Sequence, residues 1–170
     1  MDPKLSFKVG DKIVDYGHIY RIFEITKDDK NGDSDRILHF RPFFSVDITK
    51  DVVCSIPESS ITDTTIRLPV KPKDIRGMIT RLTVKPRYTE VPDAQDIKDL
   101  LNENDPEKVV DIIRILSAEK KKELGFTKSK SDILQLSKSH LVQEVALVLG
   151  IPLEKAERKV ELALERPYKN

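Results

Sequence analysis

The chain has 170 residues, of which 38% are apolar and 35% are charged, and its formal net charge is +1. This balance excludes a strongly basic nucleic-acid-binding protein, so any contact with nucleic acid has to rest on a local patch. No apolar stretch approaches the roughly 20 residues of a membrane span, and "MDPKLSFKVG" lacks the apolar region of a signal peptide. Cys54 is the single cysteine, which excludes an internal disulfide and favours a cytoplasmic location.

Residues 1–70 show the alternating pattern of β structure. The strings "DKIVDY", "IYRIFEI", "RILHFRPFF" and "DVVCSIP" are rich in residues that suit a pleated, half-buried surface. The polar loop at 27–35 contains Asn31-Gly32, a strong hairpin signal, and Pro57 ends the last strand. Four or five short strands joined by tight turns predict a small closed β-barrel.

The pattern changes over residues 71–91, where prolines interrupt any long element. This segment is interpreted as a connector, although "KDIRGMITRL" allows one short helix. From residue 92 onward the apolar residues recur at helical spacing. Asp105-Pro106 is a helix start with an N-cap, and Gly150 is a helix end. The sequence therefore predicts an all-α bundle of four helices over 92–170, and an α+β fold of two domains.

The residue types of common catalytic sites do not come together in the sequence. The three histidines have no partner at a metal-ligand spacing, and neither a phosphate-binding glycine loop nor a nucleophile motif occurs. We therefore expect a binding protein with no metal, no cofactor and no catalytic residues. An enzyme whose site forms only in three dimensions is the weakest alternative.

The opening "FKVGDKIVDYGHIYRIFEI" resembles that of the CarD family of bacterial transcription regulators, which typically reads F-x-V-G-D-x-V-V-Y-P before a His-Gly stretch. Ile56-Pro57 is similar to the family's Val-Pro strand end, and "NENDPEKVVDIIRIL" and "KSHLVQEVALVLG" look like two of its C-terminal helices. The resemblance covers residues 7–166. The matching positions of the opening are Phe7, Val9, Gly10, Asp11, Ile13 and Val14.

The resemblance implies a Tudor/SH3-like barrel that binds the β subunit of RNA polymerase. It also implies a helical domain that contacts promoter DNA at the upstream edge of the melted bubble and so changes the stability of the open complex. The exposed edge around "RPFF" and "VVCSI" is the expected protein-binding surface, while Phe43 or Phe44 is also expected in the core. The candidate polymerase-binding residues are Lys27, Arg41, Phe43, Cys54, Ser55 and Ile56.

The lysine-rich stretch "KKKELGFTKSK" is the main candidate for DNA contact, because lysines near helix ends bind phosphates without reading sequence. A solvated helix–helix loop is the alternative interpretation of the same charges. Lys85 and Arg87 form a second candidate patch. The full set of candidate DNA-binding residues is Lys85, Arg87, Tyr88, Lys120, Lys121, Lys122, Lys128, Lys130 and Lys138.

The chain departs from the family at three points. "DYGHIY" shortens the usual Tyr-Pro-x-His-Gly region, and Ser55 stands where an arginine is common. The chain has no tryptophan, whereas family members commonly use one as a wedge at the bubble edge. Tyr88 is either a substitute wedge or a linker residue. These departures keep a second hypothesis open, in which the chain is a protein–protein adaptor that does not bind DNA; in both hypotheses it is expected to be monomeric.

Overall fold

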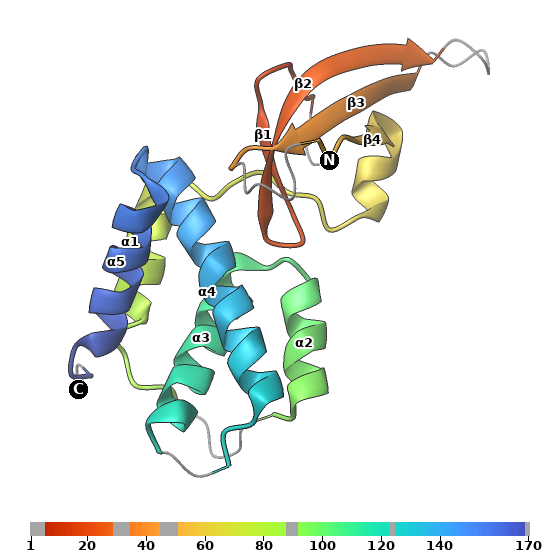
Figure 1. The fold of residues 1–170 in the computed structure, drawn as a ribbon. Coiled ribbons are helices and arrows are strands. Elements are labelled where there is room, and N and C mark those ends of the chain that lie inside the picture. The colour runs from red at the N-terminus through yellow and green to blue at the C-terminus, as the bar shows by residue number, and fades with distance from the viewer. Residues whose placement is uncertain (1–5, 29–34, 45–50, 88–91, 123–124, 169–170) are drawn as a thin grey trace. The chain divides into compact units, whose positions relative to one another are not determined.

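The computed structural model describes residues 6–28, 35–44, 51–87, 92–122 and 125–168 (Figure 1). The chain divides into two compact units, Met1–Leu68 and Pro69–Asn170. The first contains the β strands and the second contains the α-helices. The expected hairpin at Asn31-Gly32 lies outside the described residues.

The first unit is a four-stranded antiparallel sheet in the order β1-β2-β3-β4 (Figure 1). Its strands are β1 (Lys12–Asp15), β2 (His18–Asp28), β3 (Asp35–Pro42) and β4 (Cys54–Pro57). A shift in register between Ile22 and Glu24 marks a bulge in β2. After β4 the chain forms a short 3₁₀-helix, η1 (Glu58–Asp63).

The sheet is open, and the prediction of a closed barrel followed by a helical bundle is therefore wrong. Closure would require β4 to pair with β1, but β4 has only four residues and the chain turns into η1 directly after Pro57. In the described residues, the outer side of β1 carries a single isolated bridge, from Val14 to Arg67. The fold class is α+β with an open sheet, whose two edge strands are β1 and β4.

The core of the first unit lies between the sheet and η1. Phe7, Ile22 and Phe40 are almost fully buried there, together with Ile61 of η1. The segment before β1 is held by polar contacts as well, since the Phe7 N–H donates to Glu58 Oε1 at 3.0 Å. Apolar burial and these hydrogen bonds together fix the N-terminal segment against the sheet.

The second unit contains five helices: α1 (Pro72–Arg81), α2 (Ala94–Asn102), α3 (Pro106–Lys121), α4 (Lys128–Leu149) and α5 (Leu153–Glu165). Asp105 accepts a hydrogen bond from the Glu107 N–H, and Pro106 is the first helical residue, so the predicted start of α3 is confirmed. Gly150 ends α4 with φ of 62°, as predicted. The segment interpreted as a connector holds α1, because Pro72 begins a helix instead of interrupting one.

Helix α4 is central to the helical unit and contacts the other four helices (Figure 1). Its buried residues Leu134, Leu141 and Val145 pack in a core to which α3 contributes the most apolar side chains. The buried Val160 of α5 belongs to the same helical core. Burial of each such side chain stabilises the fold by about 1.5–3 kcal/mol, which fixes the helix ends where the candidate lysines lie.

Candidate nucleic-acid and protein interfaces

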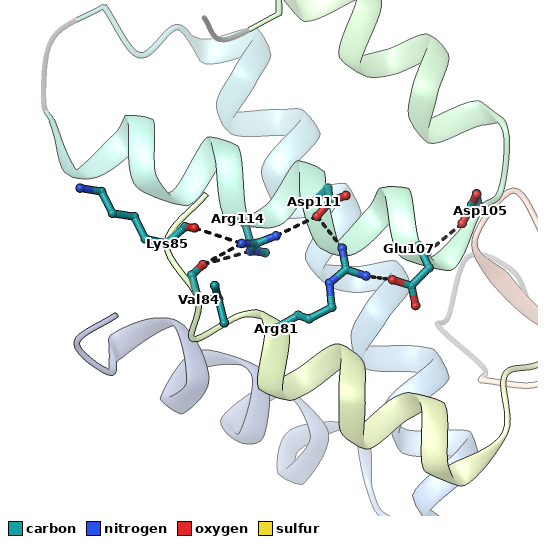
Figure 2. Close-up of polar contacts among 7 residues, drawn as sticks. All are labelled: Arg81, Val84, Lys85, Asp105, Glu107, Asp111 and Arg114. Carbon is teal, nitrogen blue, oxygen red and sulfur yellow. Dashed lines mark hydrogen bonds and ion pairs between the residues drawn. The ribbon is translucent and has the colours of Figure 1, made fainter. Parts of the chain in front are cut away.

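A network of ion pairs joins α1 to α3 (Figure 2). Arg81 near the end of α1 donates from Nη2 to Asp111 Oδ1 at 2.7 Å and also pairs with Glu107. Arg114 donates from Nη1 to the same oxygen of Asp111 at 2.9 Å. Both arginines thus have carboxylate partners on α3, and the ion pairs of Arg81 hold the C-terminal end of α1 against α3.

Arg114 also holds the segment that follows α1. Arg114 donates from Nε and Nη2 to the carbonyl oxygen of Val84, at 3.1 and 3.0 Å, and from Nη2 to the carbonyl oxygen of Lys85 at 3.2 Å. Figure 2 shows the side chain of Lys85 directed away from these ion pairs. Lys85 and Arg87 are both exposed, so two candidate DNA-binding residues lie on a segment anchored to α3. Tyr88 lies outside the described residues.

Four of the candidate lysines are exposed around the turn from α3 to α4. Lys120 and Lys121 belong to the last turn of α3, Lys122 is its C-cap, and Lys128 begins α4. Lys121 has internal partners, because it donates to the Leu164 carbonyl oxygen at 3.0 Å and lies 5.2 Å from the centre of the Tyr168 ring. The remaining three side chains extend into solvent without an ion pair in the described part of the chain.

The lysines at the start of α4 stand at an unfavourable place for the helix itself. A positive charge near a helix N-terminus opposes the helix dipole, and the first turn of α4 contains no acidic residue that would offset it. An anion bound at this end would be attracted both by the lysines and by the dipole.

Two further candidates, Lys130 and Lys138, are held in ion pairs between helices. Lys130 Nζ lies 2.7 Å from Glu119 Oε1, and both side chains are about 15% exposed or less. Lys138 Nζ lies 2.9 Å from Glu161 Oε1 and its side chain is 17% exposed. Their charges join α4 to α3 and α5, so they contribute far less to a phosphate-binding surface than the exposed lysines do.

The candidate polymerase-binding residues lie on different sides of the sheet. Cys54 and Ile56 pack against the core, whereas Ser55 alternates to the other face, where its hydroxyl is 2.7 Å from His39 Nδ1. Arg41 is exposed and stacks over the Phe23 ring, with 5.3 Å between its guanidinium carbon and the ring centre. Phe43, which is 38% exposed, and Lys27 are also accessible.

Two residues that make the edge at β4 apolar are absent from the predicted set of polymerase-binding residues. Val52 and Val53 directly precede β4 and are 42% and 58% exposed. Both valines belong to the stretch "VVCSI", whose surroundings were expected to form a protein-binding edge, and β4 lies at the edge of the sheet. The arginine network was missed, because its partners lie thirty residues apart in sequence.

The described residues do not combine into a metal centre or a reactive cysteine. No group of three or more histidine, cysteine, aspartate or glutamate residues within the described ranges is arranged to hold a metal ion. Burial raises the pKa of the Cys54 thiol, and the nearby Asp15 raises it further, so the thiolate is disfavoured. In the part of the chain that the structure describes, no helix is long and apolar enough to cross a membrane.

In comparisons with known proteins, no family model matches the chain and no curated protein matches its sequence.

Proposed function

We propose that the chain is a CarD-like transcription regulator that acts in the cytoplasm as a monomer. The sheet unit binds the β subunit of RNA polymerase, and exposed lysines of the helical unit contact promoter DNA near the upstream edge of the bubble. The observation that carries the proposal is the edge strand β4 beside the exposed Val52 and Val53. An edge strand with unpaired backbone groups and adjacent apolar side chains is suited to adding a strand or loop of a partner protein.

The DNA half of the proposal rests on Lys120, Lys122 and Lys128. These exposed side chains surround one turn between two helices, and the third stands at a helix N-terminus. Phosphate contacts of this kind position a protein on a duplex without specifying sequence. Lys85 and Arg87 extend the basic surface from the segment that Arg114 fixes on α3.

Such a protein works by differential binding and catalyses no reaction. If it binds the open promoter complex more tightly than the closed one, it shifts the population toward the open complex by the difference in binding free energy. A difference of about 1.4 kcal/mol changes the equilibrium constant about tenfold. A protein that binds the open complex more tightly acts as an activator, and one that binds the closed complex more tightly acts as a repressor.

The polymerase half is tested by measuring the binding of the full chain to fragments of the polymerase β subunit. We expect V52E/V53E to abolish binding, because it places charge on the apolar edge. The control is V9E, since Val9 is exposed to the same 58% as Val53 but lies before β1. Failure of the unaltered chain to bind any β-subunit fragment, or equal loss of binding in both variants, would contradict the proposal.

The adaptor without DNA contact is a second candidate function. It is favoured by Lys130 and Lys138, whose charges are taken up by Glu119 and Glu161, and by the absence of tryptophan. Binding of the full chain to a forked promoter duplex at several salt concentrations separates the two candidates. Affinity that falls steeply with salt supports DNA contact, whereas absence of binding at low salt supports the adaptor.

A further inference from the structure

A groove of about 610 Å³ lies between α1 and α5, at the corner where α4 ends and α5 begins. Figure 1 shows these two helices side by side in the helical unit. Half-buried Leu149 and Ile151 line the groove at this corner. The groove is separate from the exposed lysines at the turn from α3 to α4, and the function proposed above makes no use of it.

Helix α5 lines the groove with one continuous stripe. Its four lining residues are Lys159, Leu162, Ala163 and Arg166; the first three are spaced i, i+3 and i+4 and so share one face of the helix, and Arg166 is the extended C-cap residue just past its end. Leu162 is 40% exposed, although it is a large apolar residue at the centre of this stripe. The stripe is thus apolar in the middle and basic at both ends.

Helix α1 provides the opposite wall with the same spacing. Arg76, Ile79, Thr80 and Thr83 are again at i, i+3, i+4 and i+7, counting the residues just past the end of the helix. Ile79 is half-buried and Arg76 is exposed. Two facing stripes, each with an apolar residue near its centre, make a groove in which a third helix finds apolar contacts.

The charge around the groove has one sign. Of the described residues that line it, none is acidic, and the three charged ones are Arg76, Lys159 and Arg166. Within the described part of the chain these three side chains form no ion pair, in contrast to Arg81 and Lys138, which are each paired with a carboxylate. Unpaired basic groups that flank apolar surface are complementary to a partner with acidic groups flanking an apolar face.

We infer that this groove binds an acidic amphipathic helix of a partner protein. Helix α5 rises about 9 Å from Lys159 to its last residue, Glu165, and Arg166 follows as the extended C-cap, so the two basic residues lie about two turns apart along this wall of the groove. A small anion would need basic groups that converge on one point, whereas groups two turns apart match carboxylates spaced two turns apart on a helix. The apolar side chains of that helix cover Leu162 and Ile79, and its acids meet the basic ends of the stripes. This inference does not depend on the polymerase or DNA contacts proposed above.

The probe is a fluorescein-labelled helical peptide of about 16 residues, with leucines at i, i+3, i+4 and i+7 flanked by glutamates. Fluorescence anisotropy measures its binding to the full chain. We expect saturable binding, and K159E/R166E is expected to weaken it at least about tenfold. The same peptide with lysine in place of each glutamate is expected to bind the unaltered chain poorly and the variant better.

The matched control is K98E/R158E, which changes the net charge equally at two exposed residues that do not line the groove. It is expected to leave binding of the acidic peptide unchanged. Amide chemical shifts of the unaltered chain, recorded with peptide, provide a readout that needs no variant, and they are expected to change along α1 and α5. The inference is overturned if the acidic peptide does not bind, if both double variants lose binding equally, or if the shift changes lie elsewhere. Binding of dodecanoate in the groove with no binding of the peptide would assign a small amphiphile and equally overturn it.

Discussion

Arg114 of α3 donates two hydrogen bonds to the carbonyl oxygen of Val84, and its Nη1 pairs with Asp111 (Figure 2). One guanidinium thus joins the chain after α1 to a carboxylate on α3. Its side chain is only 12% exposed, so water replaces these partners poorly. A planar donor with a fixed fork makes such contacts in several directions at once, and a lysine ammonium does not reproduce them.

We expect Arg114→Ala to lower the free energy of unfolding by about 2–3 kcal/mol, because it leaves the carbonyl oxygens of Val84 and Lys85 without their charged donor and leaves Asp111 with Arg81 alone. Arg114→Lys is expected to recover less than half of that loss. Urea denaturation followed by circular dichroism measures both. Arg158→Ala, at an exposed position without an ion pair in the described chain, serves as the control. A change of less than about 0.5 kcal/mol for Arg114→Ala would show that the network contributes nothing.

The turn before β1 depends on the backbone of Gly10, whose φ is 97°. A Cβ at this position meets no atom within 4 Å, so the cost of a side chain comes from the backbone conformation alone. Gly10→Ala is expected to lower the free energy of unfolding by about 1–2 kcal/mol. Gly77 in α1 has equally open space but helical backbone, so Gly77→Ala is expected to have the opposite sign and to stabilise by up to about 1 kcal/mol. Thermal denaturation of both variants checks the difference, and equal signs would contradict the explanation.

Local signals made parts of the fold predictable from sequence. Asp105-Pro106 and Gly150 mark helix ends through interactions within a single turn, and they do so whatever packs nearby. The alternating strands were recognisable for the same reason. Whether the sheet closes depends on pairing between β1 and β4, which are about forty residues apart in the chain. No local pattern encodes that pairing, and the expectation of a barrel was wrong for this reason.

For the candidate lysines too, contacts between residues distant in the chain could not be predicted from the sequence. In sequence, the candidate lysines between 120 and 138 are alike as positive charges in or beside helical segments. Lys130 differs from Lys128 because it forms an ion pair with Glu119, which lies eleven residues earlier in the chain, on the neighbouring helix α3. Lys138 likewise meets Glu161, twenty-three residues away. Such pairs are decided by helix packing, so sequence alone cannot separate a structural lysine from one that is exposed for binding.

The carboxyl group of Asp15 at the end of β1 predicts a pH dependence of stability. Burial raises its pKa above the ordinary value of 3.8, against the opposing effects of His18 and of a hydrogen bond with the Tyr16 backbone. Because the folded state holds this proton more tightly than the unfolded state, the contribution of Asp15 to stability is present below 3.8 and is lost as pH rises through the raised pKa.

Asp15→Asn is therefore expected to be more stable than the unaltered chain near neutral pH, with an advantage that shrinks as the pH falls toward 3.8. Urea denaturation of both proteins over this range measures the difference. Asp63→Asn, at an exposed position after the sheet core, is the control and should give a difference that does not vary in this way. An advantage of the Asp15→Asn variant that grows toward acid pH would reverse the sign and contradict the assignment.

The division of the lysines into exposed and paired residues predicts separate effects on DNA binding and on stability. The triple variant K120Q/K122Q/K128Q removes three exposed charges. If these meet phosphates, it reduces the slope of log affinity against log salt for a forked duplex by about 2–3, since each phosphate contact contributes about 0.7–0.9. Its free energy of unfolding is expected to stay within about 0.5 kcal/mol of that of the unaltered chain.

Lys130→Gln is the matched variant, because it removes one charge from the same turn but breaks the pair with Glu119. Both partners of this pair are largely shielded from water, so we expect a loss of about 1–2 kcal/mol in stability and a salt slope close to that of the unaltered chain. Fluorescence anisotropy over a salt series and urea denaturation measure the two quantities on the same preparations. If Lys130→Gln changes the slope while the triple variant does not, the DNA contact lies with the paired lysines, and the exposed turn between α3 and α4 is only a solvated loop.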